Sequence, residues 1–128
     1  MFIAVIDDHT GLREAIAALL DSAGYPARTF RSAEQFLACG ELASAACLVL
    51  DEHLPDGIGG LDLQLRLLDA GRRTPIVFIS AHADADPDVP ARALQRGAVA
   101  FLRKPFDEAE FLDAVARAWR CAGIPPYT

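Results

Sequence analysis

Three aspartates each follow a short apolar segment of the sequence. Asp7 and Asp8 come directly after FIAVI, and Asp51 comes directly after CLVL. A carboxylate at the end of a buried strand destabilises the fold unless a cation or solvent compensates for its charge. Carboxylate, carbonyl and water oxygens are the ligands that a hard divalent ion prefers. Three such acids in one crevice therefore predict a Mg²⁺ (or Mn²⁺) site.

Two further side chains that could take part in binding or catalysis also lie at the ends of apolar segments. Ser80 closes PIVFIS, and Lys104 follows AVAFLR directly before Pro105. The lysine can bring a cationic group to the acids, and the X-Pro bond would hold the turn, in trans or in cis. Taken singly, each residue has a common structural explanation: a loop acid or helix N-cap, a turn hydroxyl, a surface lysine. Their joint placement after four apolar segments favours a shared site.

The segments that carry these residues alternate between strand and helix patterns. Strands are predicted at 2–6, 26–30, 47–50 and 75–80, and within AVAFLRKPFD; helices are predicted at 12–23, 33–37, 61–70 and 91–96, and after an Asp107 cap. Apolar rather than alternating strands, each followed by a helix, predict an α/β fold in which helices cover both faces of a doubly wound, five-stranded parallel sheet. Ligands of such sheets bind beyond the carboxyl ends of the strands, where all five residues fall.

Composition narrows the class of protein. The 128 residues are enough for one domain, predicted at 1–122, with 123–128 (GIPPYT) as a tail or the start of a linker. The net charge of −6 argues against direct nucleic-acid binding, which needs clustered Lys and Arg. Three cysteines match no metal motif and suit a reducing cytoplasm. The sequence shows no leader and no membrane-spanning segment, so a cytoplasmic location is expected.

Together these motifs resemble the receiver domain of two-component response regulators, whose CheY-like, flavodoxin-like sheet has the strand order 2-1-3-4-5. The resemblance rests on DD at positions 7–8, LDEHLP around Asp51, FISAH with Ser80, and FLRKPF with Lys104, and it runs from Phe2 to about Trp119. The segments LLDSAGYPARTFRSAEQFL and GAVAFLRKPF are most similar in sequence to those of FixJ-like receivers. These usually precede a helix-turn-helix output domain, which implies transcription regulation.

The resemblance implies that Asp51 accepts a phosphoryl group from a sensor histidine kinase, a role that would explain an acid at the end of a buried strand. Asp8 and Asp51 would bind Mg²⁺ directly, the backbone carbonyl of His53 would complete the protein ligands, and Asp7 would hold a metal-bound water. The chain would then be a signalling switch rather than an enzyme, catalysing only its own phosphoryl transfer and dephosphorylation.

Other positions gain implied roles from the same resemblance. Ser80 and Lys104 would meet the phosphoryl oxygens, and Phe101 matches a switch aromatic, although an inward Phe on a strand is often simply core. His53 and His82 match positions that modulate dephosphorylation, or they are ordinary loop histidines. Partner or homodimer contacts are expected on the fourth helix, fifth strand and fifth helix.

Two departures and two alternatives remain. The loop at 56–60 (DGIGG) carries an inserted residue, and the separation of Ser80 from Lys104 (104 − 80 = 24) is longer than usual, so 82–90 is predicted as a loop or a late helix start. A small haloacid-dehalogenase-like phosphatase is disfavoured because His53 stands where that motif has a second Asp. A degenerate receiver that binds partners without phosphate is the other alternative. Both a stand-alone receiver and a piece of a longer regulator are open.

Overall fold

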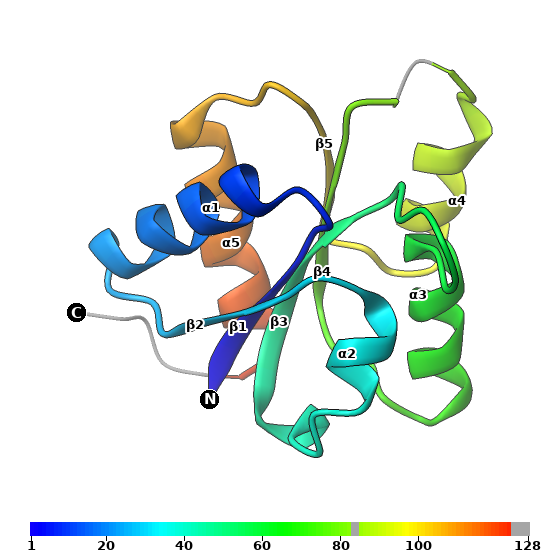
Figure 1. Cartoon of the computed structure of the whole chain (residues 1–128), viewed down its shortest axis with the longest axis horizontal. Helices are drawn as coiled ribbons and strands as arrows, with labels where there is room; N and C mark the ends of the chain where they lie inside the picture. Colours follow the sequence, from blue (N-terminus) through cyan, green and yellow to red (C-terminus); the bar gives the residue numbers. More distant parts are fainter. Residues whose placement is uncertain (83–84, 124–128) are drawn as a thin grey trace.

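A five-stranded parallel sheet forms the centre of the computed structural model, which describes residues 1–82 and 85–123 (Figure 1). The strands are β1 (Phe2–Ile6), β2 (Ala27–Phe30), β3 (Ala45–Asp51), β4 (Ile76–Ser80) and β5 (Ala100–Arg103). The helices are α1 (Thr10–Ser22), α2 (Ala33–Leu37), the 3₁₀ turn η1 (Leu42–Ser44), α3 (Gly60–Asp69), α4 (Asp88–Gln95) and α5 (Glu108–Cys121). The order β2-β1-β3-β4-β5, with every neighbouring pair parallel, confirms the predicted fold.

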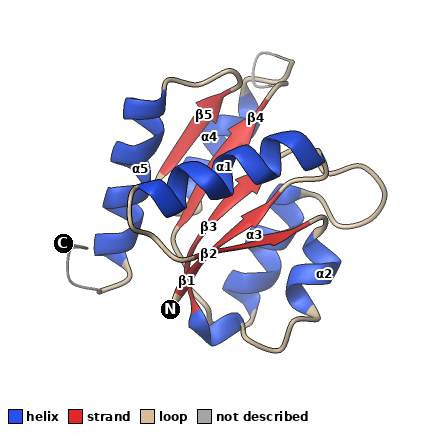
Figure 2. Ribbon diagram, turned by 60° about the vertical axis from the view of Figure 1, so that its left-hand side comes forward, coloured by secondary structure: helices blue, strands red, loops and turns tan. Residues whose placement is uncertain are grey.

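Helices cover both faces of the sheet (Figure 2), and the strands β1, β3 and β4 are buried along their whole length. One apolar cluster joins alternate strand residues to α1 and α5, and a second joins the intervening residues to α2, α3 and α4. This is why the strands have continuous rather than alternating apolar sequences. No helix in the described part of the chain has the length and apolar character needed to cross a bilayer.

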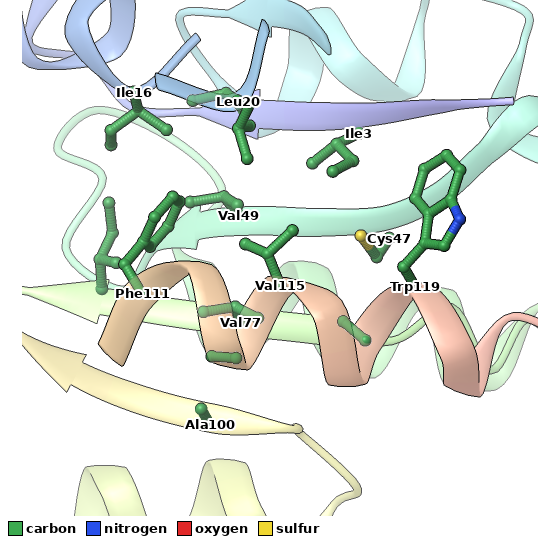
Figure 3. Packing of buried hydrophobic residues seen from close by; sticks show 14 of the residues in the cluster. Ile3, Ile16, Leu20, Cys47, Val49, Val77, Ala100, Phe111, Val115 and Trp119 are labelled. Carbon is green, nitrogen blue, oxygen red and sulfur yellow. The ribbon is translucent and has the colours of Figure 1, made fainter. Parts of the chain in front are cut away.

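Figure 3 shows the cluster under α5, where Phe111, Val115 and Trp119 pack on Val49 and Val77. Cys47 lies in this cluster with no exposed surface. Burial raises the pKa of its thiol to about 12, because a thiolate is poorly stabilised away from water. The sulfur therefore stays protonated and packs as a small apolar group.

Helix capping explains several element boundaries. Ser32 Oγ accepts a hydrogen bond from Gln35 N (3.0 Å), and Asp107 Oδ1 accepts one from Ala109 N (3.0 Å); the Asp107 cap was predicted. Neither Asp7 nor Asp8 caps α1. The N-cap is His9, whose Nδ1 accepts the hydrogen bond from Leu12 N (3.2 Å). Asp7 and Asp8 are thereby left for another role.

Other boundaries correct the prediction. β3 begins at Ala45, two residues early, and includes Asp51. α4 begins at Asp88 rather than at Ala91, with Pro90 inside its first turn. A proline is tolerated there because the first backbone N–H groups of a helix have no acceptor within the helix. The helix therefore begins three residues earlier than predicted, and the predicted loop ends before Asp88. Residues 83–84 of that loop and 124–128 of the predicted tail lie outside the described residues, so the domain boundary at 122 stays a prediction.

Candidate functional site

The carboxyl ends of β1, β3, β4 and β5 bring the predicted site residues to one edge of the sheet. Lys104 Nζ donates hydrogen bonds to Asp7 Oδ2 (3.0 Å) and to Asp51 Oδ2 (3.2 Å). Three residues separated by up to 97 positions therefore meet in one ion-pair cluster. The Lys104–Pro105 peptide bond is cis, one of the two isomers that the sequence left open.

Asp7, Asp8 and Asp51 form the acidic cluster of this edge. One oxygen of each carboxylate lies within 4.8 Å of the others, close enough for a single ion to contact all three. Asp7 and Asp51 are buried, whereas Asp8 is exposed. The all-oxygen donor set with one open side fits a hard divalent cation that keeps some of its water ligands.

Burial and charge pairing have opposite effects on the pKa of each partner in the Asp51–Lys104 pair. Burial raises the pKa of Asp51, and the nearby ammonium group of Lys104 only partly opposes this, while the charge of Asp7 adds to the rise. Burial alone would lower the pKa of Lys104, but hydrogen bonds and charge interactions with Asp7 and Asp51 outweigh it, so the pKa is raised. Lys104 is therefore a firmly held cation, and Asp51 is an acid whose ionised form depends on it.

The last polar side chains of β1, β3 and β4 are held by one repeated local motif. Each accepts a hydrogen bond from the backbone N–H two residues further along the chain. The three bonds are His9 N to Asp7 Oδ1 (2.8 Å), His53 N to Asp51 Oδ1 (3.0 Å) and His82 N to Ser80 Oγ (2.9 Å). The motif fixes the orientation of each side chain toward the crevice with short, local contacts.

A cleft of about 340 Å³ opens beside Asp51, and its wall includes the side chains of all three histidines of the protein. The rings of His53 and His82 lie against each other, with centroids 4.6 Å apart and planes at 59°. The two predicted modulators thus sit together, and both line the cleft that leads to Asp51.

Phe101 lies away from the acids. Its ring stacks on Phe78 at a centroid distance of 5.7 Å, and it is half-buried beside the cluster under α2, α3 and α4. This packing agrees with the core interpretation and does not test the switch role, which stays a prediction.

Three supporting residues escaped the sequence analysis. Arg13 on α1 is buried and donates from Nη1 to the carbonyl oxygen of Asp7 (2.8 Å), which holds the end of β1. Glu34 on α2 accepts a hydrogen bond through Oε2 from Ile58 N (3.1 Å), in the loop before α3. Gly60 packs so closely on the end of β3 that an added Cβ atom would lie 2.8 Å from the carbonyl oxygen of Asp51. Only the paired glycines at 59–60 gave a signal in the sequence.

The protein-family model described as the response regulator receiver domain matches residues 3–116, most of the chain. The chain belongs to this family. It is 38% identical to the response regulator protein TodT of Pseudomonas putida over 120 residues, which cover 94% of this chain and 52% of TodT. It is 37% identical to the transcriptional regulatory protein FixJ of Azorhizobium caulinodans over 113 residues, 88% of this chain and 52% of that protein. The receiver domain thus spans about half the length of these relatives.

Solved structures agree with this assignment. The response regulator StyR superimposes with a TM-score of 0.84 at 37% identity, over 95% of this chain and 60% of StyR. The predicted family, its FixJ-like character and its strand order are therefore confirmed. As a receiver domain, the chain is a phosphorylation-dependent signalling switch, and domains of this family are phosphorylated by sensor histidine kinases at an acidic pocket that typically binds Mg²⁺.

Proposed function

We propose that Asp51 is the residue that accepts the phosphoryl group. The observation that carries this proposal is the position of Asp51 between two other acids and Lys104, at the bottom of an open cleft. Asp7 has no exposed surface, and among the described residues Lys104 forms ion pairs with Asp7 and Asp51 but not with Asp8. Asp51 is the acid that combines access from the cleft with a cationic partner.

The reaction would be an in-line displacement at phosphorus. A carboxylate oxygen of Asp51 forms the new P–O bond while the P–N bond to the phosphorylated histidine of the kinase breaks. The electron pair of that bond stays on the imidazole nitrogen, which takes up a proton from solvent. Such transfers depend mainly on positioning and on neutralising charge, and the Asp51 side chain is held in place by His53 N and Lys104 Nζ.

Mg²⁺ (or Mn²⁺) fits the donor set described above. Asp8 and Asp51 would bind the ion directly, the backbone carbonyl of His53 would be the third protein ligand, and Asp7 would act through a water molecule. Bound there, the ion would neutralise negative charge on the carboxylates and on the incoming phosphoryl group.

Lys104 and Ser80 would bind the phosphoryl oxygens once Asp51 is modified. Lys104 Nζ already contacts Asp51 Oδ2, so a small movement would bring it to an oxygen of the new group. Ser80 Oγ accepts a hydrogen bond from His82 N, and within the described residues it donates none. Its hydroxyl proton is therefore available to a phosphoryl oxygen.

A pair of matched variants tests the acceptor. Asp51→Asn should abolish incorporation of phosphate from acetyl phosphate and Mg²⁺, measured by intact mass. Asp56→Asn should leave it unchanged, because Asp56 has a φ of 59°, a left-handed conformation that Asn also tolerates. Equal labelling of the two variants would remove the assignment to Asp51. Absence of labelling in the wild type would favour a degenerate receiver that binds partners without phosphate.

We infer that the whole signalling system includes a sensor histidine kinase and an output that regulates transcription. The support is the likeness to TodT, a response regulator, and to FixJ, a transcriptional regulatory protein. The receiver would act on an attached or separate output domain, or form a homodimer, through α4, β5 and α5. The chain itself, with a net charge of −6, would not bind DNA directly.

A further inference from the structure

A second cleft lies at the amino ends of the strands, opposite the end that carries Asp51, where α3 and α4 end. Its volume is about 100 Å³, room for roughly three water molecules. The wall includes three arginines, Arg72 and Arg73 before β4 and Arg96 after α4, together with Gln64 of α3. α3 and α4 lie side by side here (Figure 1), joined by a hydrogen bond from Gln64 to Ala93.

The three arginines have no acidic partner within residues 1–82 and 85–123. None of them takes part in an ion pair or a side-chain hydrogen bond there, although the protein as a whole carries an excess of acids. Three cationic groups around one cleft repel one another, so an anion between them would be stabilised.

Helix capping does not explain these arginines. Both helices end in the same backbone motif around a glycine of positive φ, which satisfies the last carbonyl groups. The bonds are Gly71 N to Leu68 O and Arg72 N to Leu67 O for α3, and Gly97 N to Leu94 O and Ala98 N to Ala93 O for α4. The guanidinium groups are therefore not required to satisfy the hydrogen bonding of these helix ends.

Gln64 supplies an independent sign of a ligand. It is 2% exposed, and its Nε2 donates to the carbonyl oxygen of Ala93 (3.0 Å), which fixes the orientation of the amide. Its Oε1 is buried and has no hydrogen-bond partner in the part of the chain that the structure describes. A buried carbonyl oxygen without a donor is unfavourable, so the occupant of the cleft should carry a hydrogen-bond donor as well as negative charge.

We propose that this cleft binds a tetrahedral oxyanion that keeps a proton, of which inorganic phosphate is the simplest. The charged oxygens would accept from the arginine guanidinium groups, which suit phosphate geometry. The remaining hydroxyl would donate to Gln64 Oε1. Because these groups come from α3, from α4 and from the segment before β4, the bound ion would tie the ends of the two helices together, independently of Asp51.

The proposal is tested by titrating the protein with inorganic phosphate at pH 7 without Mg²⁺, following backbone amide shifts by NMR. The amides of Thr74, Gly97 and Ala98 should move saturably, with a dissociation constant below about 1 mM. Sulfate, tetrahedral and anionic but without a proton to donate at this pH, should bind at least about tenfold more weakly, since one charge-assisted or buried hydrogen bond is worth roughly that factor.

Matched variants place the site. Arg96→Gln should weaken phosphate binding about tenfold, whereas Arg92→Gln, on the exposed side of the same helix and outside the cleft, should leave it unchanged. Equal affinity for phosphate and sulfate would overturn the role of Gln64. Shifts confined to the amides around Asp51, equal effects of the two variants, or no saturation by about 10 mM phosphate would overturn the site.

Discussion

Lys104 places one ammonium group against two buried carboxylates, and this contact sets the electrostatics of the receiver site. Burial raises the pKa of Asp51 despite that cation, so the ionised form of Asp51 is disfavoured relative to an exposed aspartate. The proposed phosphoryl transfer would nevertheless require the ionised form of Asp51 as the nucleophile. A second cation at the acids would favour ionisation further, which links metal binding to both stability and reactivity.

The first prediction concerns metal binding. Mg²⁺ should raise the melting temperature of the wild type by a few degrees, because a ligand present at ten times its dissociation constant adds about 1.4 kcal/mol to the free energy of unfolding. Asp8→Ala should remove this increment by deleting a direct ligand. Asp21→Ala, an exposed acid on α1, serves as the control and should retain it. A wild-type melting curve that ignores millimolar Mg²⁺ would count against the site.

The second prediction concerns the lifetime of the phosphorylated form. His53 and His82 line the cleft beside Asp51 with their rings in contact, so they border the approach of an attacking water. Replacing either by Ala should change the rate of dephosphorylation, followed by the loss of 80 Da of phosphate mass, while leaving Asp51 as the acceptor. If both variants decay at the wild-type rate, the two side chains have no part in hydrolysis.

The backbone of the loop between β3 and α3 packs closely against the end of β3. A Cβ atom at Gly60 would lie 2.8 Å from the carbonyl oxygen of Asp51 and 2.8 Å from the Cα atom of Glu52, whereas one at Gly59 would meet nothing within 4 Å. The start of α3 is thus fixed by its contact with the end of β3, and the position of Asp51 depends on that contact.

The third prediction uses this pair of glycines. Gly60→Ala should lower the free energy of unfolding by about 1–3 kcal/mol, because backbone atoms must move to admit the methyl group, and it should slow phosphorylation from acetyl phosphate. Gly59→Ala places an alanine at the N-cap of α3 without a steric clash, and it should cost less, at most about 1 kcal/mol. Urea unfolding gives both values, and equal stability of the two variants would contradict the close packing.

Most of the fold was predictable because apolar strands and capped helices leave local signals. The order of the sheet came from the family resemblance, and the strand ends then placed Asp7, Asp51 and Lys104 together. The start of α4 was missed because a proline in a sequence marks either a helix break or a first turn, and only the folded chain shows that Pro90 is in the first turn.

The supporting contacts of the site were not predictable for a related reason. Arg13 and Glu34 look like ordinary helix-surface residues in the sequence, and their hydrogen bonds to the ends of β1 and to the loop before α3 are made across the fold. The stacking of Phe101 on Phe78 is likewise a contact between strands. Such contacts depend on register and helix packing, which no single segment encodes.

The molecule as a whole must carry a change at one edge of the sheet to a surface that partners can reach. α4 is lightly anchored, with Ala93 as its single buried residue within the described chain and Leu94 48% exposed. Converting a protein population from almost entirely the inactive conformation to almost entirely the active one needs roughly 5.5 kcal/mol of differential binding. One hydrogen bond to a hydroxyl group supplies less than this. Lys104, Ser80, the metal and repacking around Phe101 would have to share it.

The fourth prediction tests that transmission by hydrogen exchange with and without beryllofluoride, a mimic of the phosphoryl group. Protection should change within residues 82–106 and along α5 in the wild type, and should not change in Asp51→Asn, which lacks the acceptor. Changes limited to the segments around Asp51 would defeat the switch model and leave a receiver that binds the mimic without transmitting a signal.

The order of the strands also determines when a newly synthesised chain can form its ion-pair cluster. β1 pairs with β2 and β3, and the residues that meet at the crevice are spread from Asp7 to Lys104. While the ribosome is still adding residues before 104, an emerging chain holds the aspartates but lacks the ammonium group that pairs with them. The ion-pair cluster of Asp7, Asp51 and Lys104 therefore cannot form until residue 104 has been added to the chain.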